Sequence, residues 1–126
     1  MRWSQSQGIE YDKLGDHAIS LEALQAAAAT QNVDFHPGDI LLIRTGFHVG
    51  YEALSHDEKI AWSHQHPMKH VGVETSRNMA KWLWESKFSA CVSDAPAFEA
   101  IPKRSKGIND LFLHEIMLSG WGMPIG

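Results

Sequence analysis

Runs of apolar residues in the first half of the chain predict a helix followed by a strand. Residues 20–31 (SLEALQAAAATQ) predict the helix, because Ser20 is a favourable N-cap and the alanine run has high helix propensity. Pro37 and Gly38 then indicate a turn. Residues 39–46 (DILLIRTG) place four consecutive apolar residues between polar ones, a pattern that predicts a short strand buried on both faces.

The second half repeats this alternation. Ser55 and Glu58 have the S-x-x-E spacing of a capping box, which predicts the start of a helix. Residues 74–87 predict another helix, whose inward face holds Met79, Trp82 and Leu83 and whose solvent face holds Arg77 and Lys81. Residues 88–99 (FSACVSDAPAFE) predict a short strand, and residues 109–120 predict a last helix, capped by Asn109 or Asp110 and closed by Gly120.

The final residues, GWGMPIG, continue this pattern. Trp121, Met123, Pro124 and Ile125 have the character of the beginning of a buried strand. The order of helices and strands is that of an α/β protein. Two or three strands are too few for a complete sheet covered by helices, so we expect these residues to form a portion of a larger α/β domain.

Composition narrows the class of protein. The 126 residues are 44% hydrophobic and 21% charged, which is ordinary for a globular domain. The net charge of -4 and the absence of long Lys/Arg runs argue against a nucleic-acid partner. No apolar run is long enough for a membrane span and no signal peptide is apparent, so a cytoplasmic protein is expected. Cys91 is the only cysteine and predicts a buried structural thiol.

Histidines supply the first candidates for chemistry. His64, His66 and His70 form H-x-H-x3-H, which predicts either a metal site or a polar surface loop interrupted by Pro67. His114 lies in an otherwise apolar helical segment, where an unpaired imidazole would cost stability. We therefore expect His114 to have a partner, either another side chain or a metal.

Three further residues are candidates for a site. Asp94 and Glu99 flank APAF at the end of a predicted strand, where carboxylates can position a substrate, order a loop or cap a helix. Trp121, between two glycines, is a candidate to line a pocket for an aromatic substrate.

Three segments together carry a resemblance to a known family. PGDILLIRTGF, GVETSRNMAKWLWESKFSACVSDAPAFE and LHEIMLSGWGMPIG resemble, in this order and spacing, the cyclase family of metal-dependent hydrolases, which includes bacterial kynurenine formamidase. RWSQSQGIEYDKLGDHAIS is similar to the fungal-type branch, so the resemblance covers nearly the whole chain.

The resemblance implies a swivelling β/β/α fold that here lacks its N-terminal strands, so that residues 1–126 would form the C-terminal part of a single cyclase-like domain. It implies hydrolysis of a small-molecule amide such as N-formylkynurenine, an arylformamidase reaction of tryptophan catabolism, at a zinc or manganese ion. The family's H-x-G-T-H-x-D-x-P motif, which supplies most metal ligands, does not occur in the sequence, and the glutamate expected after GMPIG would follow Gly126. His114 is the position that matches a family ligand, and Trp121 remains the candidate for substrate binding.

These implications lead to two alternative functions. The first is a portion of a metal-dependent amide hydrolase that is a homo-oligomer when intact and that is inactive, with no tightly bound metal, as this chain alone. The second is a non-catalytic remnant that acts as a scaffold or as a partner subunit.

Overall fold

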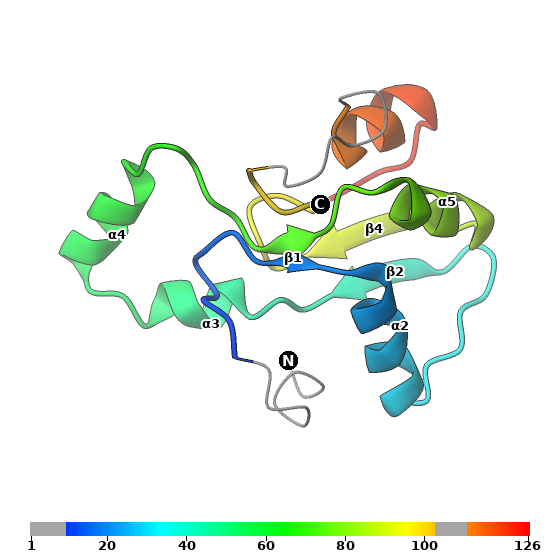
Figure 1. Cartoon of the computed structure of the whole chain (residues 1–126), viewed down its shortest axis with the longest axis horizontal. Coiled ribbons are helices and arrows are strands. Elements are labelled where there is room, and N and C mark those ends of the chain that lie inside the picture. Colours follow the sequence, from blue (N-terminus) through cyan, green and yellow to red (C-terminus); the bar gives the residue numbers. More distant parts are fainter. Residues whose placement is uncertain (1–9, 103–110) are drawn as a thin grey trace.

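The computed structural model describes residues 10–102 and 111–126, and its strands form two small parallel sheets (Figure 1). In one sheet β1 (Ala18–Ile19) pairs with β3 (Gly72–Val73), and in the other β2 (Ile40–Ile43) pairs with β4 (Ala90–Ser93). Helices lie between the strands in sequence, as parallel pairing requires. The α/β class expected from the sequence is confirmed. The expectation missed β1 and β3, because two residues are too few to show a strand period.

Two predicted helix starts are confirmed by their caps. Helix α2 (Leu21–Thr30) begins after Ser20, whose Oγ accepts a hydrogen bond from the Ala23 N–H at 3.2 Å. Helix α4 (His56–Ser63) begins after Ser55 with the reciprocal bonds of a capping box to Glu58. The short helix α3 (Phe47–Glu52) precedes α4 and was not expected, and α4 projects away from the strands (Figure 1). No described helix has the length and apolar character needed to cross a bilayer.

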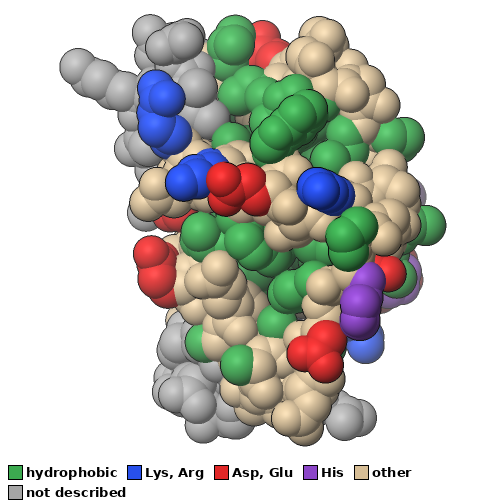
Figure 2. Space-filling view, turned by 90° about the vertical axis from the view of Figure 1, so that its right-hand side faces the viewer, with side chains coloured by type: hydrophobic (Ala, Val, Ile, Leu, Met, Phe, Trp, Pro, Cys, Tyr) green, Lys and Arg blue, Asp and Glu red, His purple; other side chains and the backbone are tan. Residues whose placement is uncertain are grey.

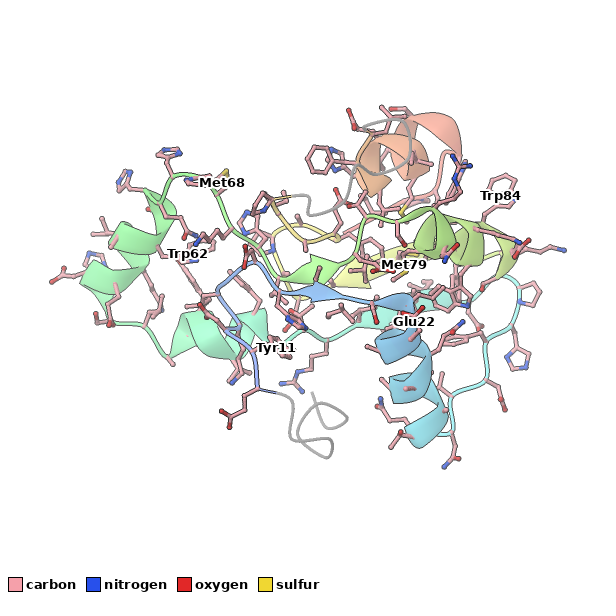
Figure 3. The ribbon with its side chains drawn as sticks, viewed as in Figure 1. Tyr11, Glu22, Trp62, Met68, Met79 and Trp84 are labelled. Carbon is pink, nitrogen blue, oxygen red and sulfur yellow. The ribbon has the colours of Figure 1, made fainter. Side chains whose placement is uncertain are left out.

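Helix α5 (Arg77–Glu85) is shorter than the predicted range of 74–87. It starts after Ser76, whose Oγ accepts a hydrogen bond from the Met79 N–H at 3.1 Å, and Lys87 beyond its end has a left-handed φ of 55°. The predicted faces are confirmed. Met79 and Leu83 are fully buried and Trp82 is partly buried, whereas Arg77 and Lys81 are exposed. Figure 3 shows Met79 directed toward the strands and Trp84 directed away from them.

The last helix differs in type from the prediction. Residues Glu115–Gly120 form a π-helix, η1, and the predicted caps Asn109 and Asp110 lie outside the described residues. The Glu115 carboxylate accepts a hydrogen bond from the Phe112 N–H at 2.6 Å just before the helix.

The C-terminal segment pairs with β4 through an isolated parallel bridge between Cys91 and Ile125, in line with the strand character predicted for it. The Cys91 N–H donates to Pro124 O at 3.0 Å, and the Gly126 N–H donates to Cys91 O at 3.1 Å. The Ser93 N–H donates to Gly126 O at 2.8 Å. Strand β4 is therefore hydrogen-bonded on both edges, to β2 and to the C-terminal residues.

The core lies where α5 and η1 contact the β2–β4 sheet. Cys91 is completely buried in it, and burial raises the pKa of its thiol to about 12. The burial predicted for this thiol is confirmed, and it disfavours the reactive thiolate form at neutral pH. The cluster consists of Leu41, Ile43, Val73, Met79, Ala80, Leu83, Phe88, Cys91, Phe98, Leu113, Met117 and Met123.

The prediction that β2 is buried on both faces is wrong for the described structure. Leu41 and Ile43 are buried, but Ile40 is 58% exposed and Leu42 is 73% exposed. The reason is that β2 pairs with β4 along one edge and with no other strand of the described residues, and no described helix covers the face of Ile40 and Leu42. An apolar run of this kind is typical of a strand whose two faces are both covered, and the described residues cover the face of Leu41 and Ile43.

Candidate functional site

A cavity of about 350 Å³ lies where the loop after β4, the helix η1 and the C-terminal residues meet. His114 contributes the one ionisable side chain among its described lining residues. The cavity is otherwise apolar, and its lining consists of Ala95, Pro96, Ala97, Phe98, Ile101, His114, Leu118, Ile125 and Gly126.

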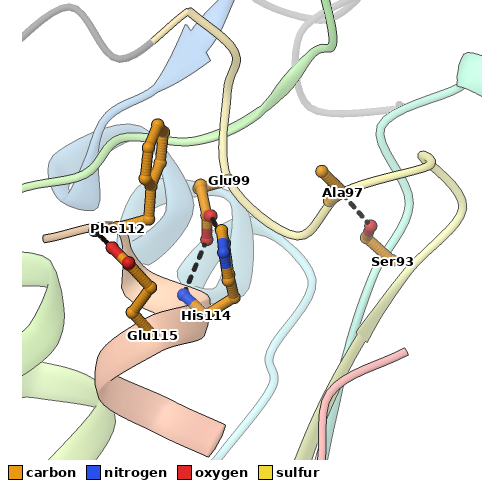
Figure 4. A network of polar contacts seen from close by, with 6 residues as sticks. All are labelled: Ser93, Ala97, Glu99, Phe112, His114 and Glu115. Carbon is orange, nitrogen blue, oxygen red and sulfur yellow. Dashed lines mark hydrogen bonds and ion pairs between the residues drawn. The ribbon is translucent and has the colours of Figure 1, made fainter. Parts of the chain in front are cut away.

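His114 is held by a buried carboxylate (Figure 4). Its ring Nδ1 contacts Glu99 Oε1, and its backbone N–H donates to Glu99 Oε2 at 3.1 Å. The Glu99 side chain is 0% exposed and the His114 side chain is 42% exposed. Of the two partners expected for His114, another side chain or a metal, the structure shows the first, the carboxylate of Glu99. With Nδ1 engaged, Nε2 is the ring nitrogen with no hydrogen-bond partner among residues 10–102 and 111–126.

The position of Glu99 depends on its close approach to β3. The Val73 N–H donates to Phe98 O at 3.0 Å, and the Ala100 N–H donates to Val73 O at 2.9 Å, so both neighbours of Glu99 are bonded to the same residue. A Cβ atom at Gly72 would lie 2.7 Å from the backbone oxygen of Glu99. Glycine at position 72 therefore permits the backbone approach that places Glu99 under His114.

Asp94 has a structural role in the described structure. Its Oδ1 accepts hydrogen bonds from the N–H and Oγ1 of Thr45 at 2.6 and 2.7 Å, and its Oδ2 accepts from the Gly46 N–H at 3.0 Å. Burial tends to raise the pKa of Asp94, but these bonds and one from the His48 N–H outweigh it and lower the pKa. Among the roles expected for Asp94, the geometry matches loop ordering and capping, because the bonds join the end of β4 to the start of α3.

The H-x-H-x3-H residues are not brought together. His64 and His66 are exposed, as a surface loop predicts, whereas His70 is 4% exposed and lies 5.8 Å from the ring of Trp62. Burial lowers the pKa of His70, and its Nδ1 has no hydrogen-bond partner within the described part of the chain. Across residues 10–102 and 111–126, no three His, Cys, Asp or Glu side chains gather closely enough to bind a metal ion.

Trp121 lines a different cavity from His114. Its ring lies 5.1 Å from that of Trp84, and both line a groove of about 540 Å³ that also includes Phe88 and Met123. Figure 2 shows apolar side chains gathered between charged ones on the end of the molecule that it faces. The structure therefore does not bring the two sequence candidates, His114 and Trp121, into one site.

The chemistry of the His114–Glu99 pair fits one ligand position of a metal. Metal-binding histidines usually donate their second ring N–H to a carboxylate or carbonyl group, which orients the ring. A catalytic zinc needs about three protein ligands. The arrangement of His114 on Glu99 is that of one such histidine with its supporting carboxylate, and no group of three possible ligands occurs among the described residues. The sequence singled out both residues, His114 for its apolar surroundings and Glu99 as a carboxylate at a strand end, but did not pair them. The signal for the pair was the need of His114 for a polar partner.

Comparisons with known proteins agree on one family. A family model described as "Putative cyclase" matches residues 5–100 of this chain. Among solved structures, a crystal structure described as that of a novel cyclase superposes with a TM-score of 0.64 at 23% sequence identity. The match covers 79% of this chain and 31% of that one, so this chain corresponds to about a third of that protein's length. A comparison with curated proteins found no match.

Proposed function

The chain belongs to the cyclase family, and from this premise we propose that it forms part of a metal-dependent amide hydrolase similar to kynurenine formamidase. The observation that supports the proposal is the His114 ring in the lining of a largely apolar cavity, with Nδ1 held by the buried Glu99 and Nε2 without a partner among the described residues. Since the chain corresponds to about a third of the solved cyclase's length, the activity is proposed for a longer protein of which these residues are one portion.

Each described residue of the site has a distinct task in this proposal. His114 supplies one ligand through Nε2, and Glu99 holds its ring in place. The apolar lining, including Phe98, Leu118 and Ile125, excludes water from the amide substrate. A zinc or manganese ion, when bound, activates water for attack on an amide carbonyl near neutral pH. The ligand set is completed from outside the described residues in this proposal, since these hold no group of three.

The substrate class is the finer part of the proposal. We propose a small-molecule amide, in particular an aromatic formamide such as N-formylkynurenine, hydrolysed in the cytoplasm by a homo-oligomer. Trp121 stays a candidate for contact with the substrate in that assembly. Its separate cavity means that this contact would require the groove beside Trp84 to lie close to the complete site.

Hydrolysis of N-formylkynurenine by an extended protein tests the proposal. The chain would be extended with an N-terminal segment that carries H-x-G-T-H-x-D-x-P and with a glutamate after Gly126. We expect chelator-sensitive hydrolysis, a loss of at least about 100-fold in His114→Ala, and no loss in His56→Ala, a matched control in an exposed position. Hydrolysis that survives both chelation and His114→Ala would contradict the proposal.

A further inference from the structure

Glu99 has no exposed surface, and within the described part of the chain both of its carboxylate oxygens contact a single residue, His114. Burying a carboxylate is costly unless it is hydrogen-bonded, so a fold retains one where its contacts serve a purpose. Here Oε2 accepts the backbone N–H of His114, and Oε1 contacts the ring Nδ1 of the same residue. Two contacts at two points of one residue fix the place of its backbone and the direction of its ring.

The backbone contact also bears on which nitrogen of the His114 ring carries the proton. A backbone N–H can only donate, so Oε2 is always an acceptor. A carboxylate offers acceptors on both oxygens, and Nδ1 therefore lies against an acceptor as well. When Glu99 is ionised, the neutral ring satisfies this arrangement in one way, with the proton on Nδ1 and the lone pair on Nε2. Phe112, whose ring is stacked 5.4 Å from that of His114, restricts the ring plane further.

We propose that Glu99 is a positioning residue that selects the Nδ1–H tautomer of His114 and so directs an unprotonated Nε2 toward the cavity. A ligand position for a divalent metal needs such a nitrogen, because an Nε2–H has no lone pair to donate. The metal role of His114 rests on the proposed function, but the tautomer is a property of this chain alone and can be measured without metal or substrate.

Exchange of the Glu99 carboxylate for an amide predicts the opposite tautomer of the His114 ring. In Glu99→Gln the amide oxygen must turn to the His114 backbone N–H, which can only donate. The amide NH2 then faces Nδ1, and Nδ1 must become the acceptor. Glu99→Gln keeps the shape and volume of the side chain, yet it should reverse the tautomer of His114 and leave the proton on Nε2. Glu115→Gln is the matched control, because Glu115 is one residue away and bonds the Phe112 N–H rather than the ring.

The experiment is 15N NMR of the histidine ring nitrogens in mildly alkaline buffer, on wild type, Glu99→Gln and Glu115→Gln. We expect Nδ1–H in wild type and in Glu115→Gln, and Nε2–H in Glu99→Gln. A wild-type ring that is protonated on Nε2, on both nitrogens, or equally on either would overturn the proposal, and this result does not depend on the folding of a variant.

A zinc titration of the extended protein separates this proposal from the proposed function. If the tautomer is reversed in Glu99→Gln and zinc affinity falls by about 10–100-fold, both hold. If the tautomer is reversed and zinc affinity is unchanged, positioning holds but His114 is not a ligand, and the proposed function fails. If Glu99→Gln leaves the tautomer as in wild type, the positioning role is overturned whatever the zinc affinity.

Discussion

Strands β2 and β4 are parallel neighbours of equal length, yet the more apolar one is the more exposed. Strand β2 has the sequence ILLI and exposes Ile40 and Leu42, whereas β4 has the sequence ACVS and exposes none of its residues fully. The difference lies in their surroundings. Strand β4 is bonded on both edges and contributes Cys91 to the core, but β2 is bonded on one edge. The apolar sequence of a strand thus indicates how many of its faces and edges are suited to burial. Among the described residues, β4 has neighbours on both edges, whereas β2 does not.

The largest expected change in the free energy of unfolding separates the face of the sheet that α5 covers from the exposed face of Ile40 and Leu42. Leu83→Ala on α5 removes a fully buried side chain and should lower the free energy of unfolding by about 2–5 kcal/mol. Leu42→Ala on β2 removes a side chain that is 73% exposed and should change it by less than about 0.5 kcal/mol. Urea denaturation of both variants measures the contrast. Equal losses would show that the face of Leu42 is covered in solution.

A smaller loss is expected where Asp94 joins the ends of the two strands. Asp94→Asn should cost about 1–3 kcal/mol, since the amide cannot accept all the hydrogen bonds from Thr45 and Gly46. The folded-state pKa of Asp94 is lowered, so its stabilisation is present above the unfolded value of 3.8 and is lost as pH falls through the folded pKa. Denaturation across acid pH should therefore show a shallower loss in Asp94→Asn. An unchanged acid profile would contradict this assignment.

The bare face of β2 should promote self-association. An exposed strand edge with apolar side chains is a template for pairing between chains. Leu42→Lys places a charge on that face and should shift the chain toward monomer in sedimentation velocity, with less than about 0.5 kcal/mol of change in stability. Ile60→Lys, at a 46% exposed position on α4, is the control and should not do so. A monodisperse wild-type monomer that melts cooperatively would exclude the idea.

The smallest effect concerns His70. Burial lowers its pKa below the ordinary 6.5, so the folded state binds fewer protons than the unfolded state below that value. Stability should fall as pH drops below about 6.5, by at most about 1.4 kcal/mol per pH unit. In His70→Asn this dependence should disappear, whereas the exposed His64→Asn should retain it. Thermal melts between neutral and mildly acidic pH would test it, and an unchanged slope in His70→Asn would refute it.

Local signals in the sequence were sufficient for much of the fold. Ser20, Ser55 and Glu58 predicted helix starts correctly, because a cap depends on neighbours within three residues. The spacing of Met79 and Leu83 predicted the buried face of α5 for a similar reason. The exposure of Ile40 and Leu42 was not predictable, because it depends on what lies across the sheet rather than on the residues themselves.

At the candidate site, too, local features could be predicted from the sequence and contacts between distant residues could not. The need of His114 for a partner followed from the apolar residues around it, but Glu99 as that partner did not, because the contact spans fifteen residues and depends on the approach of Glu99 to Gly72. The π-helical form of η1 and the burial of His70 also depend on tertiary contacts that leave no periodic trace in the sequence.

Metal stoichiometry of the extended protein tests the central claim most directly. Elemental analysis would compare wild type with His114→Ala, His64→Ala and His66→Ala. The account predicts that metal content falls in His114→Ala and is unchanged in the other two, because His114 has a buried carboxylate on Nδ1 whereas the loop histidines are exposed. Metal content that depends on His64 and His66 but not on His114 would contradict the account and favour the H-x-H-x3-H loop as the metal site.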